Sequence, residues 1–548
     1  MTRPRRNILF LMYDQLRHDY LGCAGHPHLK TPNMDRLAAM GVRFTNAYVQ
    51  SPVCGASRMS FYTGRYVHSH GASWNGFPLK VGEMTLGDHL RKLGMDAVLV
   101  GKTHMRVDAD GMERLGLARD SIIGARVAEC GFDVWVRDDG LWAKGPDGYY
   151  DRVNPQPYNE YLRSRGYAGD NPWHDFANAA EDDGEMASGW FMANADQPAN
   201  IAEEDSETPW LTRQAEAFMR QGGERPWLCH LSYIKPHWPY IVPAPYHALY
   251  DARHIVPPVR SELERQDPHP VYSAFMDNTI GRAFQRDEVL EKVIPAYMGL
   301  IAQCDDQLGR LLDFMEREGR LADTMIVLTS DHGDYLGDHW LGEKDLFHDQ
   351  SVKVPLIVYD PSPEADATRG STCDALVESI DLAATFIEAA GGAVPGHIVE
   401  GHSLMPFLRG ETPADWRKWA ISEYDWSPTP MAARLGVAPR DARLFMVADR
   451  RWKYVHAEGF RPMLFDLEND PQEFRDLGAD PEYGGVRAMM AERLATWARR
   501  PSQRTTKPDA DIERMRTGGD RTGVLIGVYE AGELAPELTE TYRGRPGR

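Results

Sequence analysis

The sequence contains few cysteines, and no two of them lie close together. Six cysteines occur among the 548 residues, without any Cys-x-x-Cys pair. Small disulfide-stabilised proteins are rich in cysteine, whereas widely spaced single cysteines are typical of proteins whose thiols stay reduced. The spacing therefore argues against a disulfide scaffold, and we expect a cytoplasmic protein.

Long apolar runs and clusters of basic residues are also missing. A membrane-spanning helix needs about 20 apolar residues, and no segment approaches that length. The apolar run at 8–13 is too short for a signal peptide, and Asp14 follows it without a cleavage site. The net charge of −20, from 81 acidic and 61 basic residues, repels nucleic acids. We expect neither a membrane nor a nucleic acid as a partner.

What the sequence does contain is an alternation of apolar strands and amphipathic helices. Strands are predicted at 7–13, 96–102, 226–235, 324–330 and 354–360. Helices are predicted at 31–41, 85–94, 287–318 and 379–391, the first between Thr31 as N-cap and Gly41 as stop signal. This alternation is typical of an α/β fold, in which helices cover both faces of a mainly parallel sheet.

After about residue 412 the pattern changes. A hairpin is predicted at 443–459 and a strand with a turn at 463–477, which indicates a smaller antiparallel α+β domain. We expect a catalytic domain at 1–412, a C-terminal subdomain at 413–500 and an extended arm at 501–548. The apolar segment 524–529 of the arm favours contacts between subunits, so we expect a homodimer or homotetramer.

Polar side chains follow three of the predicted strands. They are Asp14 and Gln15 after the first strand, Lys102 and His104 after the second, and Asp331 and His332 after the strand at 324–330. Ligands of open α/β sheets bind beyond the carboxyl ends of the strands, so these residues are candidates for one site. Carboxylate and amide oxygens suit a hard cation such as Ca²⁺, while an imidazole favours Mn²⁺.

A longer motif identifies the family that the chain resembles. Residues 54–58, Cys-Gly-Ala-Ser-Arg, fit the signature C-x-[PA]-x-R, and Thr-Gly-Arg follows at 63–65. Here the sequence resembles the type I, formylglycine-dependent sulfatases (arylsulfatases) of the alkaline phosphatase superfamily. Segments 14–44, 101–105, 330–344 and 465–477 are similar to further segments of that family. The resemblance implies an alkaline-phosphatase-like sheet with a smaller antiparallel C-terminal α+β domain.

The resemblance also implies a role for each candidate residue. Cys54 would be oxidised to formylglycine by a separate formylglycine-generating enzyme. One divalent metal ion would be held by Asp14, Gln15, Asp331, His332 and residue 54. Arg58 would orient the nucleophile, and Lys102 and His104 would contact it. His237 and Lys344 would bind the substrate's anionic oxygens and protonate the leaving group, and Asn75 would be a further substrate contact.

The chemistry of a sulfate ester explains why such a site needs these residue types. Its non-bridging oxygens carry charge throughout an in-line displacement, so arginine, lysine and a metal ion stabilise the transition state. A hydrated formylglycine has two hydroxyl groups: one attacks sulfur, and the other lets His104 act as the base that expels sulfate. A serine at position 54 would instead leave an ester that water must hydrolyse.

Two positions depart from the pattern of many sulfatases and keep other functions open. Gln15 and His332 stand where many of those enzymes carry Asp and Asn, and the pair resembles phosphonate monoester hydrolases and phosphodiesterases, which also use formylglycine. The resemblance therefore implies either Ca²⁺ or Mn²⁺ as the metal. Lys102 and His104 instead match the sulfatases.

Four functional hypotheses follow. The first is hydrolysis of sulfate monoesters, aryl sulfates above all, with promiscuity toward phosphonate and phosphate esters. The second is a phosphonate monoester hydrolase or phosphodiesterase. The third is a catalytically inactive sulfatase-like binding protein, and the fourth is a cysteine hydrolase that uses the Cys54 thiolate itself.

Overall fold

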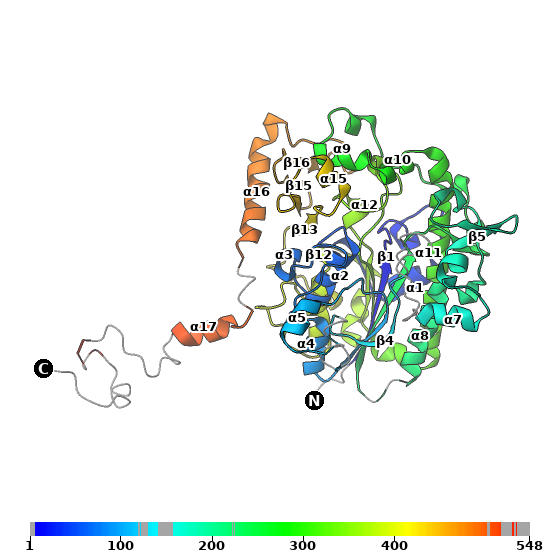
Figure 1. Ribbon diagram of the computed structural model, residues 1–548. Helices are drawn as coiled ribbons and strands as arrows, with labels where there is room; N and C mark the ends of the chain where they lie inside the picture. Colours follow the sequence, from blue (N-terminus) through cyan, green and yellow to red (C-terminus); the bar gives the residue numbers. More distant parts are fainter. Residues whose placement is uncertain are drawn as a thin grey trace. The chain divides into compact units, whose positions relative to one another are not determined.

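The computed structural model describes residues 6–118, 121, 126, 130–140, 157–221, 223, 225–500, 505–516, 529–530 and 533 (Figure 1). The chain divides into two units, one of residues 1–394 with 399–500 and the other of residues 395–398 with 501–548. Helix α17 (Asp509–Arg516) belongs to the second unit. Most of the expected arm, including 524–528, lies outside the described residues. The arm and the boundary at residue 412 therefore stay predictions.

An eight-stranded mixed sheet occupies the centre of the first unit, in the order β12-β2-β11-β10-β1-β8-β3-β4 (Figure 1). The strands are β1 (Asn7–Asp14), β2 (Val42–Tyr48), β3 (Asp96–Gly101), β4 (Asp133–Arg137), β8 (Trp227–Pro236), β10 (Thr324–Ser330), β11 (Leu356–Tyr359) and β12 (Ser371–Glu378). Only β11 runs antiparallel to its neighbours, β10 and β2, among these described strands. The expectation of a mainly parallel sheet is confirmed.

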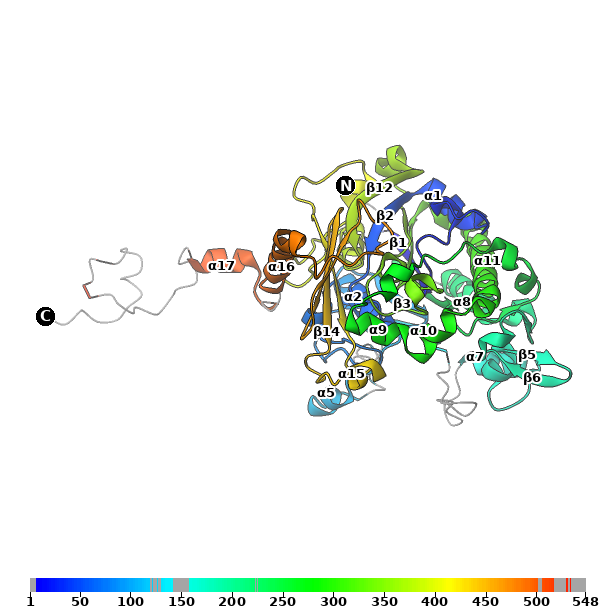
Figure 2. The same cartoon turned by 90° about the horizontal axis from the view of Figure 1, so that it is seen from above.

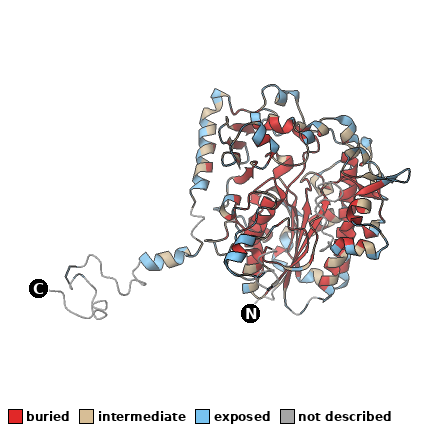
Figure 3. Cartoon of the chain, viewed as in Figure 1, coloured by how far each residue is buried: buried red, intermediate tan, exposed pale blue. Residues whose placement is uncertain are grey.

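Side chains of β1 alternate between two hydrophobic cores, one on each face of the sheet. Ile8, Phe10 and Met12 belong to one core, while Leu9 and Leu11 belong to the other. Helices α2 (Cys54–Thr63), α4 (Leu86–Lys92) and α13 (Asp381–Ala389) cover the first face. Helices α1 (Pro32–Met40), α8 (Glu207–Gln221) and α11 (Asp287–Arg317) cover the second. Burial on both faces explains why the strand reads as one continuous apolar run (Figure 3).

A smaller antiparallel sheet follows in the C-terminal part of the same unit. It consists of β13 (Ala420–Asp425), β14 (Arg443–Ala448), β15 (Trp452–Ala457) and β16 (Met463–Asp466). Helix α16 (Gly484–Ala498) lies beside this sheet (Figure 2). Its side chains Met490, Leu494 and Trp497 pack against the sheet. The expected antiparallel C-terminal fold is confirmed.

The ends of α1 differ in detail from the sequence-based expectation. Thr31 precedes the helix, but its hydroxyl does not cap it; it accepts from the backbone of Gly22 and donates to Asp35. Gly41 ends the helix without the left-handed conformation of a usual glycine stop. A Cβ at Gly41 would lie 2.3 Å from the carbonyl oxygen of Val358, so close packing on β11 requires glycine here.

Shorter elements complete the described structure. They are α3 (Val67–His70), α5 (Ala109–Arg114), α7 (Pro157–Ser164), α9 (Pro270–Met276), α10 (Thr279–Phe284), α12 (Asp349–Val352), α14 (Met405–Leu408), α15 (Pro430–Arg434) and the strand pairs β5 (Ala179–Asp182) with β6 (Glu185–Ser188) and β7 (Pro198–Ala199) with β9 (Val242–Pro243). Across the described ranges, every helix is too short or too polar to cross a membrane.

Candidate metal and catalytic site

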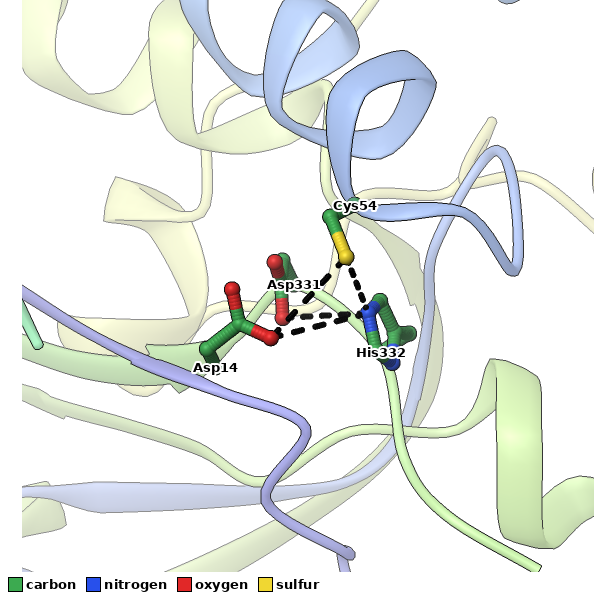
Figure 4. Close-up of side chains that lie close together, drawn as sticks. All are labelled: Asp14, Cys54, Asp331 and His332. Carbon is green, nitrogen blue, oxygen red and sulfur yellow. Dashed lines mark hydrogen bonds and ion pairs between the residues drawn. The ribbon is translucent and has the colours of Figure 1, made fainter. Parts of the chain in front are cut away.

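Four buried side chains from three elements meet beyond one edge of the central sheet (Figure 4). Asp14 is the last residue of β1, Asp331 and His332 follow β10 directly, and Cys54 is the first residue of α2. β1 and β10 pair in parallel, so their carboxyl ends lie side by side. The structure thus brings together four of the residues predicted as metal ligands, and all four are 0% exposed.

The donor atoms of these four residues converge. One atom from each lies within 4.8 Å of the others. Cys54 Sγ is 3.0 Å from His332 Nε2 and 3.9 Å from Asp14 Oδ1 (Figure 4). His332 Nδ1 lies 2.9 Å from the carbonyl oxygen of Gly333 and donates to it, which directs Nε2 toward the group. Two carboxylates, one imidazole and residue 54 therefore form a candidate ligand set for a single cation.

Arg58 connects the two carboxylates one helical turn after Cys54. Its Nη2 donates to Asp14 Oδ2 at 2.9 Å and its Nε donates to Asp331 Oδ2 at 2.8 Å. Nη1 donates to the hydroxyl of Ser232 at 2.7 Å. The guanidinium is fully buried, so these charge-assisted bonds hold the carboxylates in fixed positions. Ser232 was not predicted from the sequence, since nothing local marks a serine inside an apolar strand.

Lys102 reaches the same place from the end of β3, and His104 follows it two residues later. Lys102 Nζ is 2.7 Å from Asp14 Oδ2, and its side chain is fully buried. Gly101 precedes it with φ of 109°, and a Cβ there would lie 2.0 Å from the carbonyl oxygen of Ser232. The backbone N–H of His104 donates to Asp139 at 2.9 Å. Burial and the charge of Lys102 hold the pKa of His104 well below its usual range.

Gln15 is held by two predicted site residues, Asp331 and Lys344, and by Asp334 and Tyr240, which were not predicted from the sequence. Its backbone N–H donates to Asp331 Oδ1 at 3.1 Å, and its side-chain Nε2 donates to Asp334 Oδ2 at 2.5 Å. The hydroxyl of Tyr240 donates to the same oxygen of Asp334 at 2.6 Å. The amide oxygen of Gln15 accepts from Lys344 Nζ at 3.3 Å. Asp334 lies only two residues after His332, and this proximity was the available signal.

His237 and Lys344 form a pair on the other side of Asp14. Lys344 Nζ is 3.3 Å from His237 Nε2, and His237 Nε2 is 3.8 Å from Asp14 Oδ1. His237 Nδ1 donates to the carbonyl oxygen of Trp238 at 2.7 Å. Lys344 Nζ also lies 5.8 Å from the centre of the Trp238 ring. A protonated amine and an imidazole therefore stand next to each other at the edge of the site.

Asn75 contacts the start of helix α2. Its Oδ1 accepts from the backbone N–H of Gly55 at 2.7 Å, directly beside Cys54. A Cβ at Gly55 would lie 3.0 Å from this oxygen, so glycine leaves room for the contact. The observed contact of Asn75 fixes the backbone that carries residue 54, and a contact with substrate stays a prediction.

The site carries strong fields of both signs. Burial raises a carboxyl pKa, but the positive charges of Lys102 and Arg58, together with the adjacent His237 ring, outweigh it and hold the pKa of Asp14 well below its usual range. Burial lowers an imidazole pKa, yet Asp331 and Cys54 raise the pKa of His332 to about 9. The group of carboxylates and sulfur thus favours a positive charge at its centre, which fits a cation site.

A second buried group, the histidine stack, consists of Glu264, His339 and His348. Glu264 Oε1 is 2.6 Å from His339 Nδ1, and Glu264 Oε2 accepts from the backbone of Ser261 at 2.7 Å. The rings of His339 and His348 lie face to face, with centroids 3.7 Å apart and planes 5° from parallel. A metal lies in the plane of a ligating imidazole, about 2.1 Å from nitrogen, so two stacked rings do not converge on one ion.

Comparison with known proteins agrees with the geometry. A sequence profile described as Sulfatase matches residues 6–393. The chain belongs to the sulfatase family. A second profile, described as N-sulphoglucosamine sulphohydrolase, C-terminal, matches residues 337–500 and covers the small antiparallel sheet.

Similar proteins within and beside the sulfatase family fall into two functional groups. A multifunctional alkaline phosphatase superfamily protein, PehA of Trinickia caryophylli, is 31% identical and covers 91% of this chain and 96% of its own. An arylsulfatase of Clostridium perfringens is 26% identical over 87% of this chain and 91% of its own. The structure of a phosphonate monoester hydrolase from Silicibacter pomeroyi is 28% identical, with a TM-score of 0.77 over 93% of this chain and 96% of that one. This member of the sulfatase family is thus a hydrolase, and the proteins similar to it include both sulfatases and phosphonate monoester hydrolases.

Proposed function

We propose that this protein hydrolyses sulfate monoesters, aryl sulfates in particular, through a formylglycine made from Cys54. One observation carries the proposal: the sulfur of Cys54 stands at a helix N-terminus, within reach of Asp14 and His332, while Arg58 binds the carboxylates from behind. No other described cysteine lies in a group of candidate metal ligands. The product of its oxidation would stand where both a cation and a substrate can meet it.

A divalent cation fits the residues that are present. Asp14, Asp331, His332 and residue 54 would hold it, with the amide oxygen of Gln15 as a fifth candidate. The raised pKa of His332, caused by Asp331 and Cys54 against the effect of burial, supports a centre that attracts positive charge. When bound, the cation supplies a Lewis acid that activates its oxygen ligand. The imidazole favours Mn²⁺ and the carboxylates suit Ca²⁺.

The remaining residues around that centre would each have a separate role in catalysis. Formylglycine supplies an aldehyde whose hydrate carries two hydroxyl groups, one for attack and one for release of the product. Arg58 and Lys102 would orient residue 54 and balance the charge of the bound anion. His104 would accept the proton of the second hydroxyl. Burial and the charge of Lys102 hold its pKa well below the usual range, which keeps the imidazole in the neutral form that can accept a proton. Lys344 and His237 would bind the ester oxygens and protonate the leaving group.

Hydrolysis of phosphonate monoesters or phosphodiesters is the second candidate. Gln15 and His332 stand where many sulfatases carry Asp and Asn. The amide of Gln15 has no charge where Asp carries one, so the site is less negative. The similarity to PehA and to two phosphonate monoester hydrolase structures favours this candidate. Lys102 and His104 favour the sulfatase reading. We expect activity toward both ester types.

The kcat/KM values for an aryl sulfate, an aryl phosphonate and an aryl phosphodiester with the same phenol decide between the two. We expect sulfate to be hydrolysed fastest, and the first proposal is wrong if sulfate is the poorest substrate of the three. The kcat/KM of the Cys54→Ala variant should fall about a thousandfold or more. The kcat/KM of Cys373→Ser, a change at a half-buried cysteine outside the site, should stay unchanged.

Peptide mass of the Cys54 region tests the maturation step. Protein made together with a formylglycine-generating enzyme should carry formylglycine at position 54, and protein made without it should carry cysteine and be inactive. Activity of the unmodified protein would support a cysteine hydrolase, and inactivity of the modified protein toward all three esters would support a binding protein. Cytoplasmic location and a homo-oligomer remain part of the proposal.

A further inference from the structure

The turn that carries His237 is bound from behind by a buried lysine. Lys235, 6% exposed, lies near the end of β8. Its Nζ donates to the carbonyl oxygen of Pro239 at 3.0 Å, to that of His237 at 3.4 Å and to Asn178 Oδ1 at 3.2 Å. One ammonium group therefore joins the two ends of the 237–239 turn to each other and to the segment that carries Asn178.

The middle carbonyl of this turn sets the orientation of the His237 ring. Trp238 lies between the two carbonyls that Lys235 binds, and its own oxygen accepts from His237 Nδ1 at 2.7 Å. With Nδ1 bound in this way, Nε2 is the nitrogen that faces Lys344 Nζ at 3.3 Å. The position of His237 relative to Lys344 thus depends on a turn whose shape Lys235 maintains.

The charge of Lys235 needs compensation, because its three acceptors are all neutral oxygens. Two buried carboxyl groups provide it: Glu207 (4% exposed), whose charge acts on Lys235, and Asp138 (2% exposed), which interacts with Glu207. Glu207 Oε1 also accepts from Trp173 Nε1 at 2.7 Å. Burial and their mutual repulsion disfavour two ionised carboxylates here, so we assign a single negative charge to the pair.

The pKa values of the three groups agree with this assignment. Burial lowers the pKa of Lys235 to about 8, although the charge of Glu207 acts in the opposite direction. Burial and the charge of Glu207 raise the pKa of Asp138 well above its usual range, and burial also raises that of Glu207. Lys102 and Asp139 are the other charged groups that act on Asp138, and Lys102 acts on Lys235 and Glu207.

We propose that Lys235 is a positioning residue for the acid that protonates the leaving group, with the Asp138–Glu207 pair as its buried counter-charge. The inference rests on the proposed function, because it assigns leaving-group protonation to Lys344 and His237. It assigns a role to a residue outside the metal-ligand group. It also predicts that the rate depends on the leaving group in a specific way. A phenolate that is already a good leaving group departs without a proton, whereas a basic alkoxide or phenolate needs one.

The Lys235→Met variant tests the proposal, since methionine fills similar space without any N–H donor. For the ester type that the wild type hydrolyses, kcat/KM should fall about 30-fold with an unsubstituted phenol as leaving group and less than about 3-fold with 4-nitrophenol. The matched control is Lys292→Met, which removes a partly exposed lysine bonded to the carbonyl oxygen of Ala193 and to Asp196 and should change neither value. An equal loss for all leaving groups in folded Lys235→Met would overturn the proposal.

A second variant keeps the test decisive if Lys235→Met does not fold. The double variant Asp138→Asn/Glu207→Gln has nearly the same shape and keeps the acceptor for Trp173, but it removes the counter-charge. Lys235 then loses its proton and has two N–H donors for three acceptors, so the same leaving-group dependence should appear in weaker form. The single variants each keep one negative charge and should stay within about 3-fold of the wild type. A double variant with the leaving-group dependence of the wild type would refute the role of the pair.

A crystal structure of either variant separates this inference from the proposed function, because it needs no substrate. We expect the 237–239 turn to relax and His237 Nε2 to lose its contact with Lys344. An unmoved His237 would overturn the positioning role whatever reaction the site performs. A displaced His237 in a protein whose wild type hydrolyses none of the tested esters would support the positioning role and refute the proposed function alone.

Discussion

Two buried groups of this protein combine carboxylates with histidines, but only one of them directs its donor atoms toward a common centre. In the candidate metal site, atoms of Asp14, Cys54, Asp331 and His332 converge on a common centre, and Arg58 binds the outer carboxylate oxygens. In the histidine stack, both carboxylate oxygens of Glu264 form hydrogen bonds, and the rings of His339 and His348 face each other. Similar residue types therefore form a candidate ligand set in one place and a hydrogen-bonded, stacked packing unit in the other.

The stack has a structural task that follows from its place in the chain. His339 and His348 flank Lys344, which lies in the loop that follows Asp331 and His332. Several residues of this loop other than glycine have positive φ angles, namely Leu336, His339, Trp340, Glu343, Asp345 and Leu346. Such conformations are costly and persist where surrounding contacts enforce them. The stack is one of these contacts, so it supports the site by holding the loop rather than by binding an ion.

The largest difference between the two groups is expected in catalysis. Asp331→Asn removes a charge that a cation and Arg58 both need, and kcat/KM should fall by about a thousandfold with loss of the ion. Glu264→Gln keeps the bond to Ser261 and should lower kcat/KM by less than about tenfold. Steady-state kinetics with metal analysis of both proteins provides the measurement. Equal losses would mean that the stack is as close to the chemistry as the metal site.

Removal of metal should separate the groups by stoichiometry. Prolonged chelation should lower kcat at least about a hundredfold, and one equivalent of Mn²⁺ or Ca²⁺ per chain should restore it. The His348→Gln variant, with the stack disrupted, should still bind one ion. Two ions per wild-type chain, with one lost in His348→Gln, would show that the stack binds metal after all.

The sequence was sufficient to predict that Asp14, Lys102 and Asp331 meet, because the carboxyl ends of neighbouring parallel strands share one edge of a sheet. The position of Cys54 could be expected only from its motif, since a cysteine at the start of a helix has no pattern of its own. The antiparallel direction of β11 was not predictable from its residues. A strand buried on both faces is apolar throughout, whichever way it runs.

The supporting residues were not predictable for a different reason. Ser232, Tyr240 and Asp334 act through contacts across long stretches of chain, and Lys235 acts through carbonyl groups that have no sequence signature. Single polar residues next to apolar strands are common in any α/β protein. Only the folded geometry distinguishes those that hold a ligand in place from those that face solvent.

The smallest effect that separates the two groups is a dependence of stability on pH. Burial, with the nearby charges of His339 and Lys453, holds the pKa of His348 well below its usual value of about 6.5. The folded protein thus binds fewer protons at this ring than the unfolded chain does. The stability from the neutral ring is complete above pH 6.5 and is lost as the pH falls, by at most about 1.4 kcal/mol per pH unit.

His348→Phe tests this, because it keeps a ring against His339 and removes the titrating group. At pH 7 the variant should be less stable by about 1 kcal/mol, since the bond between Tyr335 and His348 Nδ1 at 3.0 Å is lost. Between pH 7 and pH 5 its melting temperature should fall less than that of the wild type, so the two curves approach each other. His456→Gln, at a half-exposed histidine outside both groups, should leave the pH dependence unchanged. If the melting temperatures of the variant and the wild type instead fall in parallel with pH, protonation of His348 does not destabilise the folded protein, and the prediction is wrong.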